Sequence, residues 1–180
     1  DPGQPDSTTV LSGSMQPTIR NATAADLSAI NDIYNSYIIG RNTSFDTAPW
    51  TIAERTAWYA KYRPPSRFEL IVVEVEGHVR GFASSGPFRS KAAYDSSVET
   101  TVVLDEAVTG RGFGRLLLGE IIARLESRSE LHRAYALIAL PNDPSVGLHL
   151  ELGYRTVGVL DEVGYKLGRF HSVQMMELAL

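Results

Sequence analysis

The stretch VETTVVLDEAVTGRGFGRLLLGEIIARLE, residues 98–126, decides the fold. Its first residues, 98–104, are mostly β-branched and predict a strand. A loop of alternating glycines follows, and residues 113–125 then carry apolar side chains at helical spacing. The first N–H groups of a helix have no partner within the helix, so a strand, a glycine loop and a helix start in this order indicate that an anion is held at the loop.

The glycines are spaced as Gly110-x-Gly112-x-Gly114. Arg115 stands where a dinucleotide-binding fingerprint has its third glycine, and the chain has no Walker loop. A phosphate still suits this loop, because glycines let the backbone approach a ligand and the helix dipole favours negative charge. Arg111 and Arg115 would then add charge at the rim. The alternative is a flexible turn between strand and helix with no ligand.

The composition indicates a soluble globular domain rather than a disordered or membrane protein. The chain has 180 residues, of which 43% are hydrophobic and 21% charged, with a net charge of −4. That charge gives no general attraction to nucleic acid or to an anionic membrane. No apolar run approaches the ~20 residues of a membrane span.

Cysteine and histidine content restrict the chemistry further. The sequence has no cysteine, which excludes disulfides, a thiolate nucleophile and cysteine-bound zinc. The four histidines lack metal-ligand spacing, so we expect no metal. Residues 1–16 are polar without the pattern of a signal peptide, and we expect a flexible tail followed by one domain, residues 17–180, in the cytoplasm.

The order of the other expected elements predicts an α+β fold with mixed strand pairing. A meander of strands comes first, then a β-α-β unit, then a closing hairpin. Asp143 is the expected N-cap of the last helix. The expected strands are residues 18–20, 68–75, 78–86, 97–104, 134–140 and two within 154–180, and the expected helices begin at Thr23, at Thr51, after the glycine loop and at Asp143.

With its surroundings, the loop Thr109-Gly110-Arg111-Gly112-Phe113-Gly114 resembles the acyl-CoA pyrophosphate loop of the GNAT acetyltransferase superfamily. That signature reads [QR]-x-x-G-x-[GA], from which Thr109 departs. The segments GPFRSKAAYDSSVETTVV, LPNDPSVGLHLELGY and GYKLGRFHSV resemble the phosphinothricin and methionine sulfoximine acetyltransferase family, and the likeness covers roughly residues 19–173.

This resemblance implies the GNAT fold, a mixed, mostly antiparallel twisted sheet splayed at the fourth and fifth strands and flanked by helices. It implies direct acetyl transfer from acetyl-CoA to the amino group of a small amino-acid-like acceptor. It also implies that the protein is a homodimer. Residues implied to contact the cofactor are Val102, Val103, Leu104, Gly110, Arg111, Gly112, Phe113, Gly114, Arg115 and Asn142.

Glu99 is the candidate general base. It shares a strand face with Thr101 and Val103, and a carboxylate in an apolar strand is costly unless its site is wet or functional. The resemblance implies base duty for this glutamate, and partial burial should raise its pKa. The alternative is an exposed edge or an ion pair with Arg89 or Lys91.

His149 stands where many GNAT enzymes place a tyrosine that protonates the leaving thiolate. Acid duty and a packed histidine with a satisfied nitrogen are both open. Five residues are expected on the acceptor side. Arg89, Lys91 and Tyr94 could hold an anionic group, and Thr101 and Phe45 are expected to line the pocket. The alternatives there are a solvated basic loop and, for Phe45, core packing.

Two departures from the family affect the acceptor side. Val103 replaces a tyrosine, and Met175 and Met176 replace an aromatic pair, which should give a softer wall to the acceptor pocket.

Two other function classes remain open. One is a GNAT enzyme for another amine, such as a peptide N-terminus or a polyamine, and the other is a non-catalytic acyl-CoA-binding module.

Overall fold

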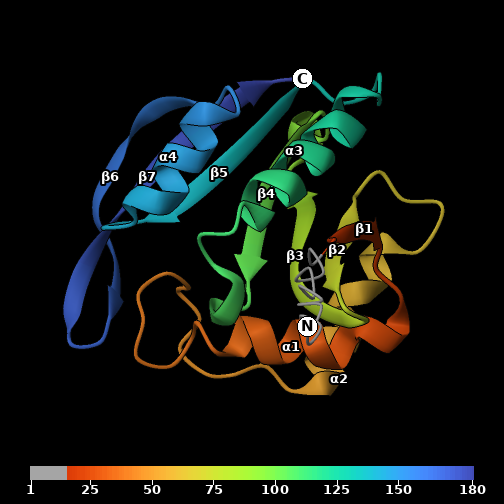
Figure 1. Ribbon diagram of the computed structural model, residues 1–180. Coiled ribbons are helices and arrows are strands. Elements are labelled where there is room, and N and C mark those ends of the chain that lie inside the picture. Colours follow the sequence, from red (N-terminus) through yellow and green to blue (C-terminus); the bar gives the residue numbers. More distant parts are fainter. Residues whose placement is uncertain (1–15) are drawn as a thin grey trace, which may run out of the picture.

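The computed structural model describes residues 16–180, so the expected tail lies almost wholly outside the described residues. Figure 1 shows one twisted sheet with the strand order β1-β2-β3-β4-β5-β7-β6. The strands are β1 Thr18–Asn21, β2 Leu70–Val75, β3 His78–Pro87, β4 Ser97–Leu104, β5 Arg133–Ala139, β6 Arg155–Lys166 and β7 Arg169–Ala179. The α-helices are α1 Leu27–Asn35, α2 Ile52–Tyr59, α3 Phe113–Glu126 and α4 Asp143–Glu151.

Strands β4 and β5 part within the sheet. They form its parallel pair, whereas the other neighbouring strands pair antiparallel. The β4–β5 pairing joins residues 97–99 to residues 133–135, yet β4 continues to Leu104 and β5 to Ala139. The splay after Glu99 confirms the predicted fold (Figure 1).

Helices cover the two faces of the sheet separately. Helix α3 packs with Val98 of β4 in one buried cluster, and α1 packs with Phe82 of β3 in another. Because side chains alternate along a strand, Val102 joins the α3 side and Val103 the α1 side. Glu99 therefore belongs to the face of α1. The expected apolar stripe of α3 is confirmed, since Phe113, Leu117, Ile121 and Leu125 are all buried.

Capping side chains define where the helices begin. Thr51 and Glu54 form the capping box that opens α2. The N-cap of α4 is Asn142, so the prediction of Asp143 was wrong by one residue. The Oδ1 atom of Asn142 accepts the Ser145 N–H at 3.3 Å, and Asp143 is already helical. No helix within residues 16–180 is long and apolar enough to cross a membrane.

Candidate active site

Glu99 lies at the point where β4 and β5 separate. It is the last β4 residue paired with β5, and it stands directly opposite Gly86 of β3. Burial raises its pKa, as expected, although the nearby cations of Arg89 and Lys61 oppose that rise. It lines a pocket of about 290 Å³, which we term the Glu99 pocket. The pocket is formed by Trp58, Lys61, Tyr62, Ser84, Ser85, Gly86, Pro87, Glu99 and Thr101.

Sequence reasoning missed the wall opposite Glu99. Trp58, Lys61 and Tyr62 come from the end of α2 and the 3₁₀ turn Ala60–Tyr62 that follows it. Their spacing of three and four residues was the available signal, because it places them on one helix face. The Lys61 Nζ atom lies 5.2 Å from the Trp58 ring centroid and 5.0 Å from that of Tyr62. Burial lowers the pKa of Lys61, and Glu99 acts to raise it.

The glycine loop leaves an open cradle at the start of α3. Gly110 and Gly112 have φ of 75° and 83°, and a Cβ at either would meet no atom within 4 Å. Gly112 is the N-cap of α3, and no side chain of the described residues caps that helix end. Unpaired N–H groups and the helix dipole therefore suit an anion here. Arg111 is exposed, and Arg115 forms an ion pair with Glu151.

Phe113 and Gly114 both contribute to packing. Phe113 does so with its side chain, and Gly114 does so by lacking one. Phe113 is buried in the core beneath α3. A Cβ on Gly114 would lie 3.3 Å from Leu148 Cδ2 and 3.5 Å from Leu104 Cδ1, so this glycine lets α3 approach α4 and β4. Phe113 and Gly114 can thus offer a ligand their backbone N–H groups, and a Gly114 side chain would meet protein rather than a phosphate.

The gap between β4 and β5 is bordered by backbone. Val102 and Val103 pack their side chains on opposite faces of the sheet, beyond the last residue paired with β5. The Leu104 carbonyl accepts the Tyr37 hydroxyl at 2.7 Å. Asn142 lies just after the end of β5, where its side chain caps α4. Of the residues predicted to contact the cofactor arm, residues 102–104 lie on β4, and Asn142 lies at the start of α4 after β5.

The residues expected on the acceptor side do not all lie in the Glu99 pocket. Thr101 lines the Glu99 pocket. Arg89, Lys91 and Tyr94 are exposed on the loop after β3, outside the pocket lining. The Arg89 guanidinium lies 4.6 Å over the Phe88 ring, yet its charge reaches Glu99. Within residues 16–180, neither Arg89 nor Lys91 forms an ion pair with Glu99.

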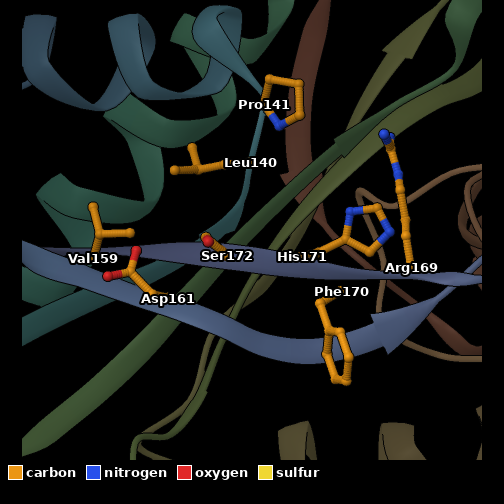
Figure 2. Close-up of a pocket in the computed structure, with 8 residues that line it drawn as sticks. All are labelled: Leu140, Pro141, Val159, Asp161, Arg169, Phe170, His171 and Ser172. Atoms are coloured by element: carbon orange, nitrogen blue, oxygen red, sulfur yellow. The ribbon is translucent and has the colours of Figure 1, made fainter.

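Phe45 lies against the β6–β7 hairpin rather than in the Glu99 pocket. Its ring packs over Gly164 and lies 6.3 Å from the His171 ring. Beside it is a second pocket of about 420 Å³, the His171 pocket, with Asp161 and Arg169 at opposite ends (Figure 2). Its lining is Leu140, Pro141, Val159, Asp161, Arg169, Phe170, His171 and Ser172.

The two methionines do not form a shared wall of the acceptor site. Met176 is fully buried in the cluster under α3, which is the face opposite to Glu99. Met175 is partly exposed and pairs with Leu137 and Gly158. The expectation of a soft wall made by both residues was therefore wrong for Met176, because alternation along β7 turns the two side chains to opposite faces.

His149 is a buried, hydrogen-bonded histidine. Its Nδ1 lies 2.7 Å from the Ser145 carbonyl, which can only accept, so Nδ1 carries the proton. Its ring meets Tyr154 edge to face at 5.0 Å, and burial lowers its pKa. A neutral imidazole with its proton on Nδ1 has an acceptor, not a donor, at Nε2. This arrangement fits the packed alternative.

Residues 30–154 match the model of the acetyltransferase (GNAT) family. The chain belongs to this family. It is an acetyl-CoA-dependent N-acetyltransferase, which confirms the activity class expected from the sequence. Within residues 16–180, no group of three or more histidine, aspartate or glutamate side chains could hold a metal ion.

Relatives confirm the narrower resemblance. A phosphinothricin N-acetyltransferase of Streptomyces coelicolor is 38% identical over 94% of this chain and 100% of its own. An L-methionine sulfoximine/L-methionine sulfone acetyltransferase of Pseudomonas paraeruginosa is 32% identical over 92% of this chain and 96% of its own. The crystal structure of a phosphinothricin acetyltransferase from Sinorhizobium meliloti in complex with acetyl-CoA matches with a TM-score of 0.86, 28% identity, and coverage of 92% and 89%.

Proposed function

We propose that this enzyme transfers acetyl from acetyl-CoA directly to the amino group of a small amino-acid-like acceptor, of the phosphinothricin, methionine sulfoximine or methionine sulfone type, with Glu99 as general base. The observation that carries the proposal is the position of Glu99. This carboxylate has a raised pKa, lines a pocket of about 290 Å³, and lies where β4 and β5 separate. The named substrates of the relatives support the acceptor class.

Acetyl-CoA would bind between the glycine loop before α3 and the gap that separates β4 from β5. The N–H groups at Gly112–Arg115 would hold its diphosphate, because no side chain within residues 16–180 caps α3 and Gly110 and Gly112 leave open space. Arg111 would add charge at the rim. The β4 backbone at residues 102–104 and Asn142 would flank its arm. Acetyl-CoA supplies the activated acetyl group, and the protein's task is to deliver a neutral amine to it.

Glu99 can remove the proton that stops an ammonium from attacking. A raised pKa brings a carboxylate closer to the operating pH, which improves a general base. Ser84, Ser85 and Thr101 place hydroxyls in the same pocket, where they can orient the amine or a bridging water. Partial burial limits competing water and strengthens the attraction between Glu99 and an ammonium.

His149 contributes to this proposal through packing. A neutral imidazole that donates from Nδ1 to Ser145 has no proton on Nε2 for a departing thiolate. Thiolates are good leaving groups and need little protonation. We therefore propose that His149 fixes α4 beside the gap.

We also propose that the protein is a cytoplasmic homodimer. Strand β6 is an edge of the sheet and runs for 12 residues with almost every side chain exposed. A long exposed apolar edge invites pairing with another chain. A second copy would cover its apolar side chains Val157, Val159, Leu160, Val163 and Tyr165. Light scattering should give twice the chain mass, and the monomer mass at micromolar concentration would contradict this.

A panel of amines tests the proposed function. Free thiol released from acetyl-CoA is measured with phosphinothricin, methionine sulfoximine, methionine sulfone, a peptide N-terminus and a polyamine. Release with the amino-acid analogues is expected. Release with peptide or polyamine alone supports an enzyme for another amine, and binding of acetyl-CoA without release supports a non-catalytic module.

A further inference from the structure

Lys61 is a cation built into the pocket that contains Glu99. Of the described residues that line this pocket, Lys61 alone is positively charged. It is partly buried against the rings of Trp58 and Tyr62. Arg89 and Lys91, the cations expected on the acceptor side, lie on the exposed loop outside the lining.

The position of the Lys61 ammonium follows from Gly86. A Cβ on Gly86 would lie 3.2 Å from Lys61 Nζ, so the ammonium rests against that glycine. Gly86 stands directly opposite Glu99 in the antiparallel β3–β4 pair. Directly opposed residues point to the same face with Cβ atoms about 4.5–5.5 Å apart. The ammonium and the Glu99 carboxylate therefore share one face and come from neighbouring positions.

Lys61 has no fixed anion in this position. Within residues 16–180, its Nζ forms no ion pair and no side-chain hydrogen bond. The charges that act on it are Glu99, which is not in ion-pair contact, and Arg55, which repels it. Aromatic rings and a carboxylate beyond ion-pair distance compensate the charge of this ammonium only in part, so the position favours binding of a further anion.

We propose that Lys61 binds the α-carboxylate of the acceptor while Glu99 receives its amine. This inference rests on the proposed function and deepens it. An α-amino acid carries an ammonium and a carboxylate on one carbon, so its two charges match the opposite charges of Glu99 and Lys61 across the pocket. A polyamine would instead set a second ammonium against Lys61. The pocket therefore selects a free α-carboxylate.

A comparison of an acid with its amide tests this role. Initial rates are measured for methionine sulfone and for its carboxamide, which lacks the negative charge, with wild type and Lys61→Met. A hydrogen bond to a charged group is expected to be worth about 10- to 100-fold in kcat/KM. Lys61→Met should lose that factor for the acid and little for the amide. The amines of the acid and the amide differ in basicity. This difference cancels when the acid-to-amide ratio of kcat/KM is compared between wild type and Lys61→Met, because it affects both proteins equally.

Controls separate the alternatives. Arg63→Met removes an exposed cation two residues away and should leave both substrates unchanged. Lys61→Arg should retain part of the preference for the acid. Equal losses for acid and amide in a folded Lys61→Met protein would overturn the proposal and assign Lys61 to tuning of Glu99.

The wild type alone also decides the matter if Lys61→Met fails to fold. At a pH above the amine pKa of both substrates, where both amines are neutral, a kcat/KM ratio near one for acid and amide would overturn the role of Lys61 and leave the amino-acid N-acetyltransferase function intact. Absence of turnover with every amino acid of the panel would instead overturn the proposed function itself.

Discussion

Gly86 of β3 stands directly opposite Glu99 of β4, and the side chain that Gly86 lacks leaves the space in which the Lys61 ammonium lies. One cross-strand pair thus fixes the positions of a carboxylate and a cation on the same face of the sheet. Under the proposed role of Lys61, a glycine on a different strand takes part in acceptor recognition.

A methyl group at Gly86 should weaken acceptor binding. In Gly86→Ala the new Cβ lies 3.2 Å from Lys61 Nζ, and the flexible lysine must move. A hydrogen bond to a charged group is worth about 1.5–3 kcal/mol, so a partial loss of about 1 kcal/mol on displacement of the ammonium should raise KM for the amino acid about fivefold. Gly119→Ala on α3 is the control, since its Cβ meets nothing within 4 Å. Steady-state kinetics with equal KM in both variants would contradict the placement of Lys61.

The cofactor cradle depends on the backbone of Gly112. Gly112→Ala forces an L-residue to a φ of 83°, which costs about 1–2 kcal/mol and shifts the N–H groups proposed to hold the diphosphate. We expect weaker acetyl-CoA binding by calorimetry. Gly77→Ala in the β2–β3 turn is the matched control, with φ of 76° and equally open space. It should lose similar stability and keep its acetyl-CoA affinity. Equal affinities in the two variants would move the cofactor site away from this loop.

His149→Phe separates packing from acid duty. The substitution keeps an aromatic ring against Tyr154 and removes the hydrogen bond to the Ser145 carbonyl. We expect a stability loss of about 0.5–1.5 kcal/mol for the lost side-chain hydrogen bond, because the Ser145 carbonyl keeps its helical partner, and a kcat within about threefold of wild type. A fall in kcat of about 10²-fold or more, with normal folding, would restore His149 as the proton donor.

The start of the domain is held by an ion pair whose pH dependence has a defined sign. The Arg20 guanidinium hydrogen-bonds Asp26 at 2.8 Å and lowers the pKa of Asp26 to about 2. A lowered pKa stabilises the folded state above the unfolded pKa, and this stabilisation is lost as pH falls from about 4 to about 2. After allowance for solvent screening, Asp26→Asn should cost about 1–2 kcal/mol at pH 7.

Denaturation at several pH values tests this ion pair. The gap in stability between wild type and Asp26→Asn should close in acid. A gap that is unchanged at pH 2.5 would show that Asp26 acts through packing or through its hydrogen bonds to Thr23.

Local pattern predicted much of the fold. The β-branched run of β4, the glycines before α3 and the capping pair Thr51 and Glu54 each act within a few residues, so sequence alone revealed them. The sequence did not reveal whether Asn142 or Asp143 caps α4. That depends on the backbone torsion angles of the two residues, and both have side chains that can cap a helix.

The proposed acceptor side was harder to predict because the residues involved come from distant segments. Lys61 and Glu99 are neighbours through the β3–β4 register, because Gly86 pairs with Glu99 and leaves space for the Lys61 ammonium. Phe45 joined the β6–β7 hairpin through contact with Gly164, more than a hundred residues away. Sequence spacing carries no signal for either relationship, whereas it did identify Glu99 and Thr101 as one strand face.

Glu99→Gln tests the central claim most directly, because it keeps size and hydrogen bonding and removes the ability to accept a proton. The measurement is the pH profile of kcat for an amino-acid acceptor, with acetyl-CoA affinity measured alongside. A positioned base contributes about 10²–10⁴-fold, so kcat should fall within that range while acetyl-CoA still binds. Wild type should lose rate as pH falls through the raised pKa of Glu99, and the variant should lack that acidic limb and recover partly at high pH. A near-normal kcat with the same acidic limb in Glu99→Gln would contradict the account and place the base elsewhere.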